Sequence, residues 1–87
     1  MSNLVERVAL TLPVEEATVL RRRVRFSTFL LNRGITLVTE PAEPFVNNDG
    51  TRVPTVALRV QAETELACGM GCGFLVAVSE GVHELGA

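Results

Sequence analysis

The sequence predicts an α+β domain of order β-α-β-β-β, in which a four-stranded, mostly antiparallel sheet carries one long helix on one face. Three observations lead to this fold class. Apolar and polar residues alternate near the N-terminus and again over residues 55–67, as in half-buried strands. Residues 14–33 instead carry apolar side chains at helical spacing. The glycine-rich stretch 68–73, CGMGCG, then separates two apolar runs, as a hairpin loop would.

The chain has 87 residues, which is enough for one domain. We expect residues 1–87 to form that domain, with 1–3 and 82–87 flexible and 40–54 in a loop. Two charged residues fall within the first nine positions, which argues against a signal peptide. No apolar run approaches the roughly 18 residues that a membrane span needs. These features predict a cytoplasmic protein that does not bind membranes.

The first expected strand covers residues 4–12, where Val8, Leu10 and Leu12 alternate with more polar side chains. Pro13 follows, and proline suits the first position of a helix. The helix is expected over residues 14–33, because Gly34 suits the left-handed conformation that commonly follows a helix end.

Two apolar stripes run along this expected helix. The stripe expected to cover the sheet consists of Ala17, Leu20, Val24 and Leu31. The second stripe consists of Val19, Phe26 and Leu30, and a fold with one helix layer offers nothing to bury it. Burying a Phe or Leu side chain is worth about 1.5–3 kcal/mol. We therefore predict that a second copy of the chain, or another protein, covers this stripe.

Three further strands are expected. The first, residues 35–39, precedes a proline-rich stretch that forms either a loop or a broken edge strand, with a turn at Asn48-Asp49-Gly50. The longest covers residues 55–67, with Val56, Leu58, Val60, Ala62, Thr64 and Leu66 on its apolar side. Residues 74–79 are apolar on both faces and are expected to form a central strand.

The segment from residue 65 to residue 79 has a second interpretation, as a buried helix capped by Thr64. Three glycines inside a helix would cost about 2.5–3 kcal/mol relative to alanine, and the strand-like alternation continues through Leu66. We therefore favour the hairpin, with residues 68–73 as its loop.

Cys68 and Cys72 are the only two cysteines in the chain. Their spacing matches no common zinc motif, although His83 with Glu80 or Glu84 would complete a ligand set. We predict two small apolar thiols, with no metal and no cofactor. A small-ligand or metal-binding module that uses the loop 68–73 is kept as an alternative.

Arg21, Arg22, Arg23 and Arg25 make the middle of the helix basic, and Arg21 shares a face with Arg25. A nucleic-acid-associated protein that uses Arg21, Arg22 and Arg25 is the other alternative, and it ranks ahead of the ligand-binding or metal-binding module. The net charge of −2 and the scarcity of aromatic residues make nucleic acid the less favoured partner.

No arrangement of nucleophile, base and acid is recognisable, so we do not expect an enzyme. The predicted function is that of a small protein-interaction module: an inhibitor, an adaptor or an assembly subunit, including accessory proteins of phages or mobile elements. Its partner is expected to be another protein, a second copy of the chain, or both. The residues predicted to bind a partner are Val19, Arg21, Arg22, Arg23, Arg25, Phe26 and Leu30.

Overall fold

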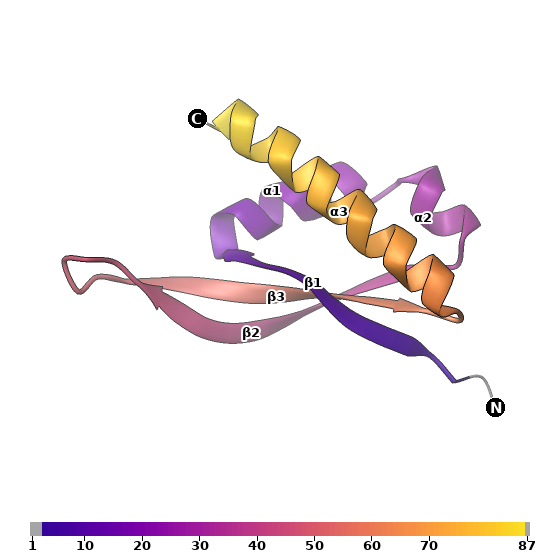
Figure 1. Cartoon of the computed structure of the whole chain (residues 1–87). Coiled ribbons are helices and arrows are strands. Elements are labelled where there is room, and N and C mark those ends of the chain that lie inside the picture. Colours follow the sequence, from indigo (N-terminus) through magenta and orange to yellow (C-terminus); the bar gives the residue numbers. More distant parts are fainter. Residues whose placement is uncertain (1–2, 87) are drawn as a thin grey trace.

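A computed structural model describes the backbone of residues 3–86 and the side chains of residues 3–81. The elements in chain order are β1 (Val5–Pro13), α1 (Val14–Val24), α2 (Thr28–Asn32), β2 (Thr36–Val46), β3 (Arg52–Ala62) and α3 (Glu65–Gly86). The strands form one antiparallel sheet in the order β1-β3-β2, and the helices lie together on one of its faces (Figure 1). The α+β class is confirmed, whereas the prediction of four strands and one long helix is wrong.

The core lies between the helices and the central strand β3. Leu20 and Val24 of α1 meet Leu58 and Val60 of β3, and Leu75 of α3 completes the cluster. The C-terminal helix α3 packs on β1 and β3 and also contacts α1. The alternation predicted for residues 55–67 is confirmed from Leu58 to Ala62, where β3 ends, whereas Ala57, expected on the polar side, is also buried.

β1 lies one residue further along the chain than the predicted strand 4–12, and it does not follow the predicted alternation. The register against β3 shifts between Val8 and Leu10, as happens where a β-bulge places one extra residue in a strand. Leu10 and Leu12 still pack against the core, whereas the Val8 side chain is exposed. The bulge therefore moves Val8 to the face that carries no helix.

The long helix predicted over 14–33 is wrong, because it is divided into two helices. α1 ends at Val24, and Ser27 adopts an extended conformation with ψ of 120° before α2 begins. The turn changes which leucine is buried: Leu30 is 4% exposed and Leu31 is 66% exposed. The second apolar stripe therefore does not exist as one surface, and Leu31 does not belong to the first.

Packing of α2 against α3 accounts for this change of direction. The Phe29 ring stacks on the Phe74 ring with centroids 4.7 Å apart, and the Arg33 guanidinium lies 3.8 Å from the Phe29 ring centroid. Gly34 then adopts a positive φ of 64°, as predicted for the residue after a helix end. Ile35 follows it into the core.

Most of the stretch 40–54, predicted as a loop, belongs to strands. β2 continues to Val46 and β3 begins at Arg52, so only the turn between them is a loop. β2 tolerates Pro41 and Pro44 because it lies at the sheet edge, where a missing backbone donor leaves no ladder bond unmade. The register of β2 against β3 shifts between Ala42 and Phe45, the interval that contains Pro44. The alternative of a broken edge strand is thus the correct one.

The predicted Asn-Asp-Gly turn is confirmed at the end of this hairpin. Gly50 has a positive φ of 85°, and the Thr51 amide donates a hydrogen bond of 2.9 Å to the Asp49 carboxylate. Hydrogen bonds from Thr51 hold the pKa of Asp49 below its usual value, because they stabilise the ionised form.

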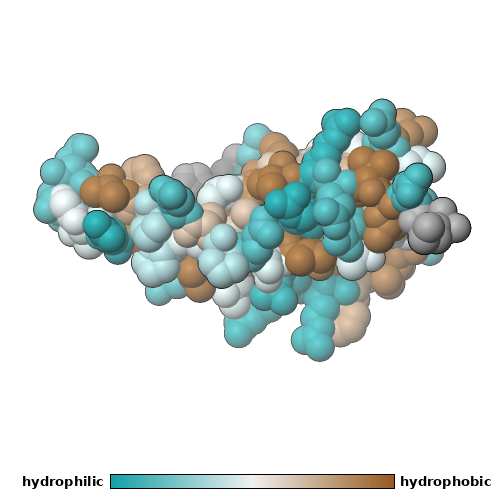
Figure 2. Space-filling view, turned by 90° about the horizontal axis from the view of Figure 1, so that it is seen from below, coloured by the Kyte–Doolittle hydropathy of each residue, from teal (hydrophilic) through white to brown (hydrophobic). Residues whose placement is uncertain are grey.

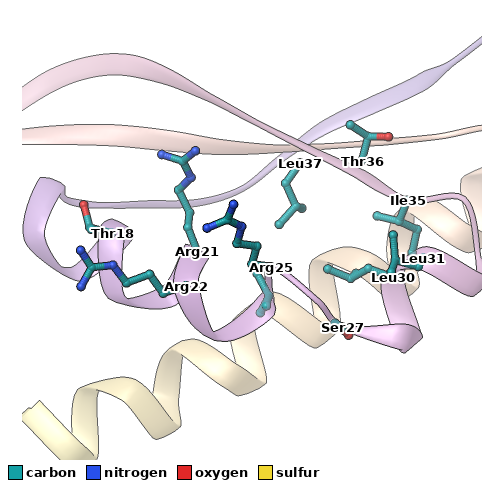
Figure 3. A pocket seen from close by; sticks show the side chains of 11 residues that line it. Thr18, Arg21, Arg22, Arg25, Ser27, Leu30, Leu31, Ile35, Thr36 and Leu37 are labelled. Atoms are coloured by element: carbon teal, nitrogen blue, oxygen red, sulfur yellow. The ribbon is translucent and has the colours of Figure 1, made fainter.

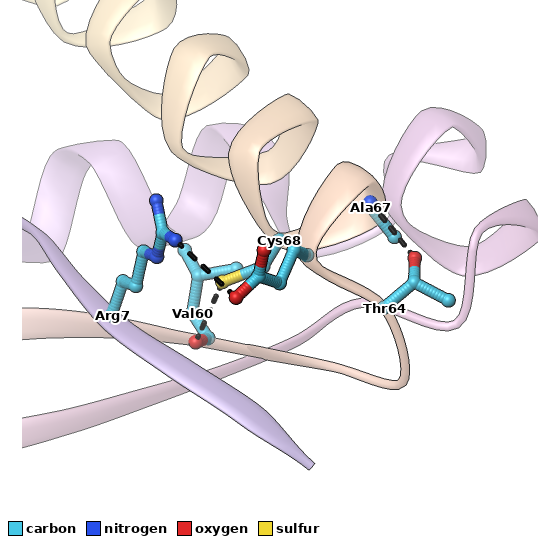
Figure 4. A network of polar contacts seen from close by, with 6 residues as sticks. Arg7, Val60, Thr64, Ala67 and Cys68 are labelled. Carbon is cyan, nitrogen blue, oxygen red and sulfur yellow. Dashed lines mark hydrogen bonds and ion pairs between the residues drawn. The ribbon is translucent and has the colours of Figure 1, made fainter.

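The hairpin predicted over 55–79, and its final strand 74–79, are wrong, and the alternative of a buried helix is correct. The Thr64 hydroxyl caps α3 by accepting a hydrogen bond of 3.0 Å from the Ala67 amide (Figure 4). α3 then continues to Gly86, through the residues expected to form a flexible tail, while Met1, Ser2 and Ala87 lie outside the described residues. In the described part of the chain, no helix has the length and apolar composition required to cross a membrane.

Close approach to the sheet explains one glycine of α3. A Cβ atom on Gly71 would lie 2.9 Å from Cγ1 of Val60 and 3.1 Å from Cγ2 of Ile35. Gly69 and Gly73 have no such neighbour within 4 Å. Only Gly71 therefore allows the helix to lie as close to β3 as it does, and this tertiary contact offsets its low helix propensity.

Candidate functional site

A groove of about 620 Å³ opens between α1, α2 and the beginning of β2 (Figure 3). It forms because α1 and α3 pack on β1 and β3. On the side of the sheet that carries the helices, the edge strand β2 is therefore left uncovered. The groove is lined by Thr18, Arg21, Arg22, Val24, Arg25, Ser27, Leu30, Leu31, Ile35, Thr36 and Leu37.

Arginine side chains form one wall of the groove. Arg21 of α1 and Arg25, the residue directly after α1, extend toward the strands, and Arg22 extends beside Thr18 (Figure 3). All three arginines are exposed. No carboxylate among the described residues forms an ion pair with any of them. This wall therefore carries concentrated positive charge that is available to an anionic group.

Apolar side chains form the rest of the groove. Leu30 and Ile35 are buried beneath it, and the half-buried Leu37 points into it from β2 (Figure 3). Leu31 also lines the groove, and most of its side chain is exposed. A ligand that fits this groove needs both negative charge and apolar surface.

The face of the sheet opposite the helices differs from the groove because its charged groups are paired with one another. Arg59 lies at 2.6 Å from the Glu40 carboxylate, which raises the pKa of Arg59 above its already high value. Gln61 donates a hydrogen bond to Glu6 in the same layer. Polar and apolar residues are mixed over this face of the molecule (Figure 2). Because the charged groups named here already have partners, this face offers less free charge to an anionic ligand than the groove does.

Four of the seven residues predicted to bind a partner line the groove, namely Arg21, Arg22, Arg25 and Leu30. Val19 and Arg23 are exposed elsewhere on α1. Phe26 lies in the turn between α1 and α2, where it is 78% exposed and the Arg25 guanidinium lies 5.2 Å from its ring centroid. The structure thus brings three of the four predicted arginines together with Leu30, but it leaves Arg23, Val19 and Phe26 outside the groove.

The sequence-based reasoning missed Leu31, Ile35 and Leu37. It placed Leu31 in the core because it assumed one uninterrupted helix. Ser27, directly before the apolar stretch that contains Leu30, is a residue type favoured at helix starts. Reading Ser27 as a second helix start would have placed Leu31 on a different face.

Cys68 and Cys72 occupy one face of α3 instead of a loop. Cys68 is completely buried, and its Sγ lies 3.6 Å from the carbonyl oxygen of Val60 (Figure 4). Burial raises the pKa of the Cys72 thiol, and the neighbouring Cys68 raises it further. A raised pKa lowers the fraction of reactive thiolate at neutral pH. Both cysteines are free.

Within the described residues, no three His, Cys, Asp or Glu side chains are grouped closely enough to hold a metal ion. The side chains of His83 and Glu84, which the metal-binding alternative needs, lie outside the described residues. Residues 68–73 lie within α3, so they do not form the ligand-binding loop of that alternative.

Burial makes the two cysteines unequal in their effect on stability. Cys68→Ser is expected to lower the free energy of unfolding by about 1–3 kcal/mol, because it places a hydroxyl in an apolar site. Cys72→Ser, at a partly exposed site, is expected to change it by less than about 0.5 kcal/mol. Urea denaturation of the two variants measures the difference, and equal effects would contradict the packing of α3.

Comparison with protein-family models, curated proteins and solved structures finds no significant match. The basis for assigning a function is therefore the chemistry of the groove.

Proposed function

We propose that this chain is a non-enzymatic protein-interaction module whose groove binds a protein segment carrying both acidic and apolar side chains. The observation that carries the proposal is the arginine wall, which has no ion pair to the described carboxylates and faces an apolar surface within one groove. An inhibitor, an adaptor and an assembly subunit all act through a contact of this kind.

The residue types support binding in two ways. Arg21 and Arg25 present planar guanidinium groups, which form paired hydrogen bonds with carboxylates and lose little flexibility in doing so. Leu31 is 66% exposed, and covering such a side chain contributes up to about 1.5–3 kcal/mol. Charge would orient the partner segment, and apolar burial would supply much of its affinity.

Fluorescence anisotropy with labelled peptides tests the proposal. A short peptide in which glutamate alternates with leucine is expected to bind, and the same peptide with lysine for glutamate is not. Arg21→Glu combined with Arg25→Glu is expected to weaken binding at least about 30-fold, since each lost charged contact is worth on the order of 1–3 kcal/mol.

Arg23→Glu is the matched control, because Arg23 lies on the same helix but outside the groove lining. It is expected to leave the affinity within about two- to threefold of the original, which is the scale of a distant screened charge. Equal losses from the control and the double variant would mean that general charge, not the groove, binds the peptide.

Single-stranded nucleic acid is the second candidate ligand. The arginines could contact phosphates, and the exposed Phe26 ring beside Arg25 offers a surface on which a base could stack. It is less favoured because the groove lining contains no aromatic side chain and the chain has a net charge of −2. Labelled single-stranded DNA and RNA that bind more tightly than any peptide, with strong salt dependence, would favour this candidate over the protein segment.

A further inference from the structure

We propose that the groove is occupied by the β-arm of a second copy of this chain, and we define the β-arm as residues 43–53. This inference rests on the proposed function and names the protein segment. In a two-fold dimer, each copy would place its β-arm in the groove of the other, so that two equivalent contacts form.

The β-arm extends beyond the part of the sheet that the helices cover (Figure 1). The molecule is correspondingly elongated, with dimensions of 47 × 28 × 16 Å. Phe45 and Val46, near the end of the β-arm, are 60% and 57% exposed, and an apolar patch is visible on the projecting end (Figure 2). Exposed Phe and Val side chains on a projecting hairpin are typical of a contact site.

The chemistry of the β-arm is complementary to that of the groove. The β-arm carries the acidic residues Glu43 and Asp49 on either side of the apolar pair Phe45 and Val46, with Arg52 as its one basic residue. These are the two properties, negative charge and apolar surface, that the groove requires. The same chain thus carries both the groove and a segment whose charge and apolar surface complement it.

The β-arm cannot reach the groove of its own chain. β2 leads from the groove at Leu37 directly outward to Phe45. At about 3.3 Å per residue, this extended strand separates the two by roughly 26 Å. A second copy is therefore needed to bring a β-arm and a groove together.

The full chain is tested by sedimentation equilibrium over a range of concentrations. We expect a dimer, and we expect Phe45→Glu to shift it to monomer with at least about a 30-fold increase in the dissociation constant, since the loss of buried apolar anchors is commonly worth 2 kcal/mol or more. Leu66→Glu is the control: Leu66 is a 76% exposed apolar residue on α3, outside the groove lining, so this variant should remain dimeric.

A charge exchange tests the specific pairing. A groove variant with Arg21→Glu and Arg25→Glu is expected to be monomeric, as is an arm variant with Glu43→Arg and Asp49→Arg. Mixing the two should restore a dimer, because each of the two contacts then joins opposite charges. Circular dichroism of each variant confirms that it is folded.

The outcomes separate this inference from the proposed function. A wild-type chain that stays monomeric at high micromolar concentration while its groove still binds the acidic peptide would overturn the second copy and leave the proposed function intact. Dissociation by Leu66→Glu but not by Phe45→Glu would place the dimer contact elsewhere. Failure of the acidic peptide to bind a monomeric groove would instead count against the proposed function.

Discussion

Replacing Leu75 with alanine is expected to lower the free energy of unfolding by about 2–5 kcal/mol, because the lost apolar contacts add to the cost of the cavity left behind. Leu75 is 0% exposed and lies in the core between α3 and the sheet. The total stability of a domain of this size is roughly 5–10 kcal/mol. Leu75→Ala should therefore lower the urea midpoint strongly or prevent stable folding.

Leu66→Ala is the matched control on the same helix. Leu66 is 76% exposed, so its truncation is expected to change stability by less than about 0.5 kcal/mol. In the hairpin predicted from the sequence, Leu66 would instead face the core and its loss would be costly. Similar effects from both variants would contradict the orientation of α3.

Gly71→Ala is expected to destabilise the protein by about 1–3 kcal/mol, although alanine is the better helix former. The added methyl group would lie 2.9 Å from Cγ1 of Val60, and both the helix and the strand are fixed in a close-packed core, where overpacking is costly. Thermal unfolding followed by circular dichroism at the helical band measures the effect.

Gly73→Ala supplies the control, because no atom lies within 4 Å of the position that its Cβ would take. The substitution is expected to stabilise the protein by about 0.5–1 kcal/mol through helix propensity alone. Opposite signs for the two substitutions would verify that α3 lies against β3 at Gly71. A stabilising Gly71→Ala would show that the helix lies further from the sheet.

Features set by local chemistry could be predicted from the sequence. Alternation located β1 to within one residue, although its bulge was not foreseen, and identified most of β3. The turn around Asp49 and Gly50 was correctly placed. The positive φ of Gly34 was also expected from its position after an apolar helical stretch. These features depend on neighbouring residues, so the signals lie within a few positions of one another.

The candidate site was predicted only in part, because only some of its features depend on residues close together in the sequence. Arg21 and Arg25 share a face of α1 because of helical spacing alone, and the sequence indicated that. Their position opposite Leu37 depends on the turn at Ser27 and on β2 lying at the sheet edge. Neither the turn nor the edge position follows from spacing along the chain.

The sequence by itself determined the α+β class, the approximate positions of β1, of the beginning of β2 and of most of β3, and the basic face of α1. The tertiary structure alone decided that residues 65–86 form a helix, that the chain turns at Ser27, and that Leu30 is buried while Leu31 is exposed. The physical reason is that both α3 and α2 contain residues with weak or ambiguous local preference. Contacts with Val60, Ile35 and Phe74, distant in sequence, supply the free energy that selects the observed conformation.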